Sequence, residues 1–196
     1  FIHAFSSAGT GGFSNRNASV GAYGSVAIDL IITVFILLFS LNFAVYFLLL
    51  TRKWREALSS DELRFFLLVV TGATILIAID IAPLYTSIWE SLRYSVFQVA
   101  SIISTTGFAT ADFVLWPHFS QTILVLLMFC GACAGSTGGG IKCSRVLILL
   151  RSIRREIHRV IHPRSVEVVK LDGKVVEEDT LRSISVFVGS YLFIIL

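Results

Sequence analysis

A short tract of threonine and glycine occurs twice in this chain, each time between apolar segments. The two copies read Thr10-Gly11-Gly12-Phe13-Ser14 and Thr105-Thr106-Gly107-Phe108-Ala109. When Gly12 is aligned with Gly107, Ser6 also aligns with Ser101. Glycine permits backbone dihedrals that other residues avoid, and its missing side chain lets a ligand approach closely. The tract therefore predicts a backbone that turns its carbonyl groups toward a ligand.

The composition indicates an integral membrane protein. Hydrophobic residues make up 55% of the chain and charged residues only 15%, whereas soluble domains are about 25% charged. Irregular backbone inside a membrane is tolerated only where protein buries it or water reaches it, and potassium filters are rings of backbone carbonyls. We interpret the chain as part of a cation-conducting protein. It begins without Met and ends in an apolar run, so we expect an internal fragment.

Long apolar runs predict helices that cross the membrane. Residues 26–50 form one run, about 37 Å long as a helix, and residues 64–85 form a returning run. The basic residues between 52 and 55 place the junction on the cytoplasmic side. Residues 121–150 are expected to form a third crossing, and residues 181–196 begin another.

The order of these segments predicts parallel repeats. Residues 89–103 are too short to span a bilayer and lead into the second Thr-Gly tract, as a re-entrant pore helix would. Residues 1–8 resemble the end of a similar helix. Two crossings separate the tracts, so both lie on the outer side. We therefore expect an all-α membrane protein with parallel helix–pore loop–helix repeats around a central ion path, like a potassium channel, rather than inverted repeats.

The third crossing is interrupted by a run of small residues. It reads Gly131-Ala132-Cys133-Ala134-Gly135-Ser136-Thr137-Gly138-Gly139-Gly140. Glycine costs about 1 kcal/mol per helix position relative to alanine. We expect an unwound loop inside the membrane. Packing of small residues between helices is the alternative.

Basic residues and a hairpin signal follow the third crossing. The basic residues are Lys142, Arg145, Arg151, Arg154, Arg155, Arg159 and Arg164. They indicate the cytoplasmic side, and binding to lipid phosphates or an acidic partner is possible. Asp172-Gly173 between β-type runs predicts a small cytoplasmic hairpin used for contact.

Several isolated polar residues leave more than one role open. His3 either faces the ion path or packs the pore helix, and Asn42 is expected to bond a neighbouring helix. Asp80 is a functional candidate as an intramembrane carboxylate, or it caps or pairs with a helix. Asp112 either concentrates cations at the outer mouth or caps a turn.

Other functional classes are disfavoured by the motifs. Cys130 and Cys133 have C-x-x-C spacing, but no second ligand pair follows, and with Cys143 they suit an apolar run; we expect neither a metal site nor a disulfide. Ile141 and Lys142 break the phosphate-binding pattern, so we expect no enzyme and no organic cofactor. The basic run lacks interleaved aromatic residues, which disfavours nucleic acid. A non-conducting membrane scaffold remains an alternative.

Three stretches give the chain a specific resemblance to the Trk/Ktr/HKT superfamily of potassium transporters, and most of all to bacterial TrkH-type membrane subunits. They are His3-Ala4-Phe5-Ser6 with Thr10-Gly11-Gly12-Phe13-Ser14, Ser104-Thr105-Thr106-Gly107-Phe108, and Ala134-Gly135-Ser136-Thr137-Gly138-Gly139-Gly140-Ile141-Lys142. The resemblance covers essentially the whole chain. The third stretch is the most distinctive, because potassium channels do not share it.

The resemblance implies four repeats, of which this chain holds the middle part. Residues 1–58 would be the pore loop and second helix of the second repeat, and residues 59–162 the complete third repeat with its re-entrant pore loop and broken helix. Residues 163–180 would be a cytoplasmic hairpin linker, and residues 181–196 the start of the fourth repeat.

The family's functional parts can be assigned to matching positions. The expected filter residues are Thr10, Gly11, Gly12, Thr105, Thr106 and Gly107, with potassium at Thr10, Gly11, Thr105 and Thr106. The expected gating loop consists of Gly135, Ser136, Thr137, Gly138, Gly139, Gly140 and Lys142. Potassium would be the transported ion; a sodium-permeable or cation-coupled symporter is the alternative.

The resemblance also implies partners and a location. We expect a homodimer in the cell inner membrane, with several crossings and contacts to membrane lipids. We further expect a cytoplasmic, nucleotide-binding regulatory subunit similar to TrkA.

Overall fold

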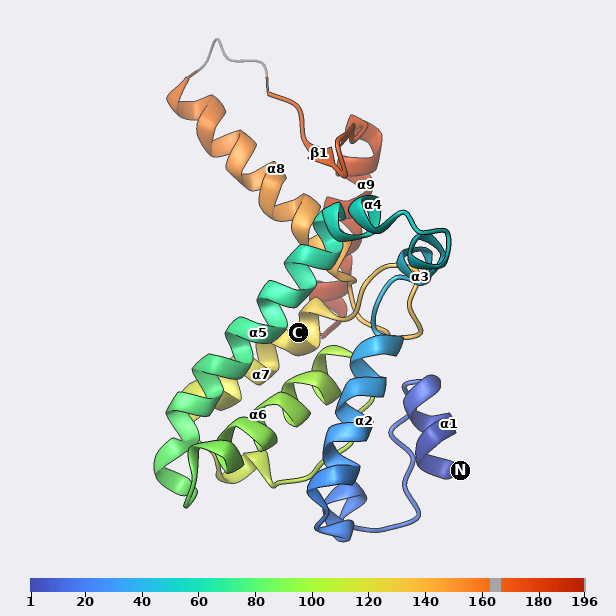
Figure 1. Cartoon of the computed structure of the whole chain (residues 1–196). Helices are drawn as coiled ribbons and strands as arrows, with labels where there is room; N and C mark the ends of the chain where they lie inside the picture. Colours follow the sequence, from blue (N-terminus) through green and yellow to red (C-terminus); the bar gives the residue numbers. More distant parts are fainter. Residues whose placement is uncertain (163–166, 196) are drawn as a thin grey trace.

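The computed structural model describes residues 1–162 and 167–195, and its regular structure is almost entirely helical (Figure 1). The α-helices are α1 (Ile2–Ala8), α2 (Val26–Phe39), α3 (Phe43–Leu50), α4 (Trp54–Ser59), α5 (Asp61–Ile81), α6 (Ile88–Ile103), α7 (His118–Cys130), α8 (Cys143–Ile161) and α9 (Glu178–Ile195). Short 3-10 helices occupy Ser19–Tyr23, Ala82–Leu84 and Phe113–Leu115. The expected all-α class is confirmed.

The longest apolar helix is α5. With the 3-10 turn after it, it forms a segment, Asp61–Leu84, that is long and apolar enough to cross a membrane. This agrees with the crossing predicted at residues 64–85. The short helix α6 then returns into the fold alongside α5 (Figure 1).

The apolar run at residues 26–50 is not a single helix, and this prediction was wrong. The chain bends by 91° between α2 and α3. At the bend, the Ser40 hydroxyl donates to the Ile36 carbonyl at 2.7 Å, which competes with regular helix bonding. Among the described residues, the hydrogen bond of the Asn42 side chain is local: its Oδ1 accepts from the Ala44 N–H at 2.9 Å and caps α3.

The break predicted within residues 121–150 is confirmed. Helix α7 ends at Cys130 and α8 begins at Cys143, with an irregular segment between them. We call residues 131–142 the Gly-rich loop. In Figure 1 this loop leaves the α7 end, passes close to α3, and returns to α8.

The hydrophobic core holds α6 between its neighbours. Val99 and Ile103 of α6 pack with Ile77 of α5 and Leu124 of α7. On its other side, Phe97 of α6 packs with residues of α2. The helix that precedes the second Thr-Gly tract is therefore fixed on two sides.

Carboxylates on two apolar helices have specific partners. Asp29 of α2 lies 3.7 Å from Arg93 of α6, and both side chains are largely buried. Asp80 accepts hydrogen bonds from the Ser120 N–H at 3.2 Å and the Ser120 hydroxyl at 2.6 Å. Of the roles left open for Asp80, the structure supports capping and pairing, here at the start of α7. Asp112 likewise caps a turn, accepting from the Val114 N–H at 3.1 Å.

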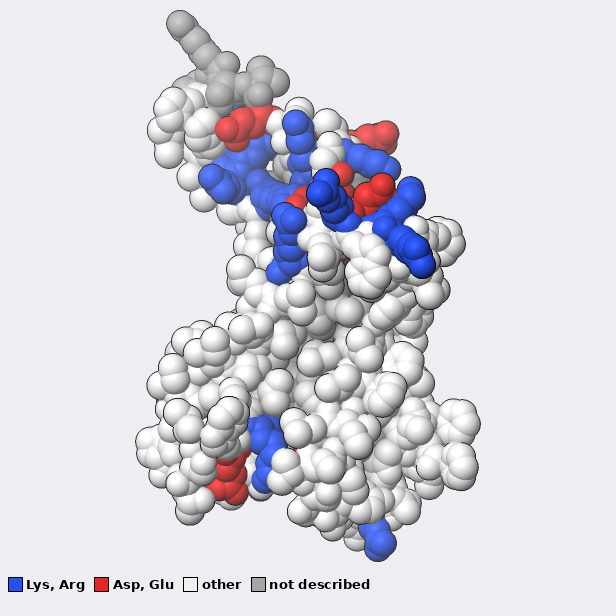
Figure 2. Space-filling view, viewed as in Figure 1, with Lys and Arg blue, Asp and Glu red and all other residues white. Residues whose placement is uncertain are grey.

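Charged side chains gather at one end of the molecule. Figure 2 shows Lys, Arg, Asp and Glu concentrated at that end, beyond a broad uncharged middle. Helix α8 contributes Arg155, whose pKa is raised mainly by its hydrogen bond to Glu178 at 2.5 Å. The same end carries the predicted hairpin, which is confirmed as β1 (Lys170–Leu171) paired antiparallel with β2 (Lys174–Val175). Arg164 and the rest of residues 163–166 lie outside the described residues.

Candidate functional site

The two Thr-Gly tracts have positive φ angles at the same two matched positions. We call residues 10–13 the first Thr-Gly loop and residues 105–108 the second. Thr10 and Thr105 have φ of 49° and 61°, and Gly12 and Gly107 have φ of 68° and 82°. Threonine rarely adopts this left-handed region, so its recurrence at both matched positions indicates a conformation that the surroundings impose.

Matching hydrogen bonds tie each loop to the helix before it. The Gly11 N–H donates to the Ser6 carbonyl at 2.8 Å, and at the matched positions the Thr106 N–H donates to the Ser101 carbonyl at 3.0 Å. The serine hydroxyls also reach matched residues. The Ser6 hydroxyl accepts from the Phe13 N–H at 2.6 Å. The Ser101 hydroxyl donates to the carbonyl of Phe108, the residue that matches Phe13, at 2.6 Å. The sequence repeat is therefore a structural repeat.

The two loops contact each other. A Cβ built on Gly12 would lie 2.1 Å from the Thr106 carbonyl oxygen, which no real side chain could tolerate. Gly12 is thus required both by its positive φ and by this close approach. Thr106 is buried, while Gly11, Thr105 and Gly107 have exposed surface.

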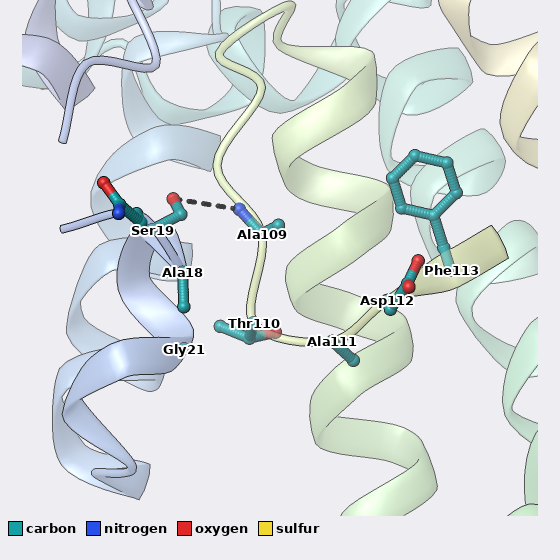
Figure 3. A pocket seen from close by; sticks show the side chains of 9 residues that line it. Ala18, Ser19, Gly21, Ala109, Thr110, Ala111, Asp112 and Phe113 are labelled. Carbon is teal, nitrogen blue, oxygen red and sulfur yellow. Dashed lines mark hydrogen bonds between the residues drawn. The ribbon is translucent and has the colours of Figure 1, made fainter. Parts of the chain in front are cut away.

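On one side of these loops is an open pocket of about 480 Å³, formed where two segments meet (Figure 3). Its lining comes from residues 17–19, residue 21 and residues 109–113. The Ala109 N–H donates to the Ser19 hydroxyl at 3.3 Å, and the Gly21 N–H donates to the Ala109 carbonyl at 3.0 Å. Asp112 is one of the lining residues (Figure 3).

His3 packs beside the loops. Its ring lies 5.5 Å from the rings of Tyr23 and Phe108, and its Nε2 is 3.0 Å from the Ser14 hydroxyl. Of the two roles left open for His3, these contacts support packing.

The Gly-rich loop contacts both Thr-Gly loops. The Gly139 N–H donates to the Thr105 hydroxyl at 2.7 Å, and the Thr10 hydroxyl donates to the Thr137 carbonyl at 3.2 Å. A Cβ on Gly138 would lie 2.8 Å from the Ser104 carbonyl oxygen. The structure therefore brings the residues expected for a filter and those expected for a gate into one cluster.

Backbone hydrogen bonds join the Gly-rich loop to the bend between α2 and α3. The Cys133 N–H donates to the Ser40 carbonyl at 3.0 Å, and the Phe43 N–H donates to the Gly135 carbonyl at 3.2 Å. Lys142 turns its ammonium group onto the Gly138 carbonyl. The Ser136 hydroxyl closes a local turn by donating to the Cys133 carbonyl at 2.6 Å.

Glu62 is a site residue that the sequence did not indicate. Its side chain is 5% exposed. Its Oε1 accepts from the Ala134 N–H at 2.6 Å and the Ser144 N–H at 3.1 Å. In the sequence, Glu62 is an acidic residue in the first turn of an apolar helix. Such residues are common, and their position does not indicate which groups they bond.

The cysteines lie at the two ends of the Gly-rich loop. Cys130 and Cys143 are free thiols with sulfur atoms 3.6 Å apart, and Cys133 is buried nearby. Among residues 1–162 and 167–195, no three His, Cys, Asp or Glu side chains are grouped as a metal site would require.

The structure encloses irregular backbone between apolar helices, two of which join at a sharp bend. This is the architecture of a helical membrane protein. A family model described as TrkH, cation transport protein, matches residues 1–196. The chain therefore belongs to the TrkH family. This is a transporter family, in agreement with the expectation that the chain is not an enzyme.

Individual relatives agree with this membership. The chain is 36% identical to the Trk system potassium uptake protein TrkH of Halomonas elongata, covering 98% of this chain and 40% of the relative. It is 35% identical to TrkG of Escherichia coli K12, covering 96% and 39%. The crystal structure of the potassium transporter TrkH from Vibrio parahaemolyticus matches with a TM-score of 0.90 and 33% identity, covering 97% and 42%. The chain thus spans about two fifths of the length of these relatives.

Proposed function

We propose that this chain forms part of the potassium path of an uptake protein in the cell inner membrane. The observation that carries the proposal is the contact between two loops with matched positive φ angles, Gly12 against Thr106, at the ends of two short helices. Such loops offer carbonyl oxygens without side chains in the way. The relatives' description as potassium uptake proteins supports potassium as the ion.

The repeat organisation is part of this proposal. Residues 1–58 are the pore loop and second helix of the second of four parallel helix–pore loop–helix repeats, and residues 59–162 are the complete third repeat. Residues 163–180 are a cytoplasmic hairpin linker to the fourth repeat, which residues 181–196 begin. The matched bonds from Ser6 and Ser101 support this division, because each loop leaves its helix in the same way. The rest of the full-length protein completes the ring.

The filter consists of backbone oxygens from both Thr-Gly loops. Its residues are Thr10, Gly11, Gly12, Thr105, Thr106 and Gly107, with potassium held at Thr10, Gly11, Thr105 and Thr106. Potassium in a filter exchanges its hydration shell for such carbonyls. The open pocket beside Asp112 is the outer approach to it.

The Gly-rich loop is the gate. Gly135, Ser136, Thr137, Gly138, Gly139 and Gly140 have few side-chain atoms to repack, and glycine tolerates the dihedral changes that movement requires. The loop's contacts with Thr10 and Thr105 keep it directly against the filter. The Lys142 ammonium, held on the Gly138 carbonyl, opposes cation passage while the loop is closed.

Regulation comes from the charged end of the molecule. The basic residues there indicate the cytoplasmic side, and the hairpin at Asp172-Gly173 contacts a nucleotide-binding regulatory subunit similar to TrkA. The full-length protein works as a homodimer surrounded by membrane lipids.

Ion flux in proteoliposomes of the full-length protein tests the proposal. We expect potassium uptake well above sodium uptake, and deletion of residues 135–140 should raise resting potassium flux and weaken its regulation. Liposomes without protein and the unaltered protein are the controls. Sodium flux equal to potassium flux would favour the sodium-permeable alternative, and no flux would favour the scaffold. Normal, fully regulated flux after the deletion would make the Gly-rich loop a packing feature.

A further inference from the structure

We propose that Asp61 and Glu62, in the first turn of α5, are positioning residues that couple the cytoplasmic hairpin to the Gly-rich loop. We call this pair the α5 joint. The inference names the residues through which the proposed gate is controlled, and so it rests on the proposed function.

Glu62 forms the side of the joint that faces the Gly-rich loop. One carboxylate oxygen accepts N–H groups from Ala134, inside the loop, and from Ser144, in the first turn of α8. A buried carboxylate requires such donors, and hydrogen bonds to a charged acceptor are about twice as strong as neutral ones. The position at the start of α8 also suits a negative charge. Glu62 therefore joins the residues that precede and follow residues 135–140 at one point.

Asp61 forms the side of the joint that faces the hairpin. Its N–H donates to the Asp172 carboxylate at 2.6 Å, and its own carboxylate accepts from the Asp172 N–H at 2.9 Å. Arg151 of α8 donates to the same Asp61 carboxylate at 2.8 Å and to the Lys170 carbonyl at 2.5 Å. Three elements, α5, α8 and the hairpin, thus meet at Asp61.

The adjacency of these two residues gives the joint its function. Because Asp61 and Glu62 are consecutive in the first turn of one helix, a displacement of the hairpin moves the backbone that carries Glu62. Glu62 bonds Ala134 and Ser144, which lie on either side of residues 135–140, so that movement changes the strain on the loop. A partner that draws the hairpin away from α5 would loosen the loop, and one that presses it against α5 would hold the loop closed.

The test follows the accessibility of Cys133, which is 1% exposed within the Gly-rich loop. Full-length protein with its other cysteines replaced by alanine is reconstituted, and two rates are measured: labelling of Cys133 by N-ethylmaleimide and resting potassium flux. Glu62→Gln should raise both about tenfold, the effect expected from weakening a charge-assisted hydrogen bond. Glu62→Asp, which keeps the charge but reaches less far, should give a smaller rise and serves if Glu62→Gln does not fold. Glu56→Gln, an exposed carboxylate on α4, is the matched control.

A double-variant cycle tests the coupling between the two sides. In the protein that retains Glu62, Asp172→Ala should speed Cys133 labelling. In the Glu62→Gln background the same substitution should raise the labelling rate little further, because the joint is already broken. Asp172→Asn should restore the slow rate, since asparagine accepts the hydrogen bond and tolerates the φ of 49° found at this position. If Asp172 had only a structural role, the factors by which Asp172→Ala and Glu62→Gln raise the labelling rate would multiply in the double variant.

The outcomes separate the α5 joint from the gate. Unchanged labelling in Glu62→Gln, or a full Asp172→Ala effect in that background, would overturn the joint while the deletion of residues 135–140 still tests the gate. Faster labelling with unchanged flux would uphold the joint as a device that positions the loop and would overturn the gate assignment.

Discussion

The two Thr-Gly loops share their positive φ angles and differ in their surroundings. In the second loop, Phe108 is fully buried against α2 and α6, whereas the matched Phe13 of the first loop is 74% exposed. The glycines differ in the opposite sense. Gly12 faces the Thr106 carbonyl at a distance no Cβ could occupy, while nothing lies within 4 Å of a Cβ built on Gly107.

This difference shows that two copies of a repeated tract can keep the same positive φ angles through different contacts. The second loop is held by the hydrophobic packing of its phenylalanine, and its glycine is needed only for the positive φ. The first loop is held by its contact with the second, and its glycine is needed for space as well. The asymmetry predicts which substitutions the two loops tolerate.

The largest difference is expected between Gly12→Ser and Gly107→Ser. Both should lower the preference for potassium over sodium, because a side chain at positive φ costs about 1–3 kcal/mol. Gly12→Ser should abolish the preference, since its Cβ would push the Thr106 carbonyl out of place. Relative uptake of the two cations in proteoliposomes measures this. Equal losses in the two variants would contradict the asymmetry, and no loss in either would remove both loops from the filter.

The next difference is expected between Phe108→Ala and Phe13→Ala. Truncating a buried phenylalanine costs about 3–5 kcal/mol, and Phe108 packs with Val20, Ile36 and Phe97. Phe13 has no such environment, so its variant should unfold at nearly the original temperature. Thermal unfolding of the purified protein in detergent measures both. A larger drop for Phe13→Ala would mean that the first loop is the one anchored by packing.

Much of the fold could be predicted from local sequence signals. The Gly-rich tract predicted a break between α7 and α8, the Asp172-Gly173 pair predicted the hairpin, and the short run before Thr105 predicted α6. Each of these predictions depends on residues with a strong local preference for a turn, a helix break or a helix. The alignment of Gly12 with Gly107 pairs two residues that both have positive φ in the structure.

Other features depend on contacts that no local pattern encodes. Residues 26–50 contain neither glycine nor proline, and the local signals at the bend, Ser40 and Asn42, were too weak to predict it. That bend is maintained by backbone bonds to Cys133 and Gly135, almost a hundred residues away. Glu62 was missed for the same reason, because its partners lie 72 and 82 residues further along the chain.

The smallest difference is expected where the two loops touch the Gly-rich loop. Thr105 accepts the Gly139 N–H at 2.7 Å, so Thr105→Val removes the acceptor and leaves that donor without its partner. The Thr10 hydroxyl has one proton to share between the Gly9 carbonyl at 2.8 Å and the Thr137 carbonyl at 3.2 Å, so its bond to the loop is the weaker one.

Losing a hydrogen bond worth about 1 kcal/mol shifts an equilibrium about fivefold. Thr105→Val should therefore raise resting potassium flux by about that factor, and Thr10→Val by clearly less. Thr105→Ser keeps the hydroxyl and should restore the low resting flux, which distinguishes loss of the acceptor from a change in side-chain shape. Because valine retains the backbone carbonyl, the preference for potassium over sodium should be preserved in both valine variants. A rise in flux for Thr10→Val that equals the rise for Thr105→Val would mean that the two loops restrain the Gly-rich loop equally, despite their different hydrogen bonds.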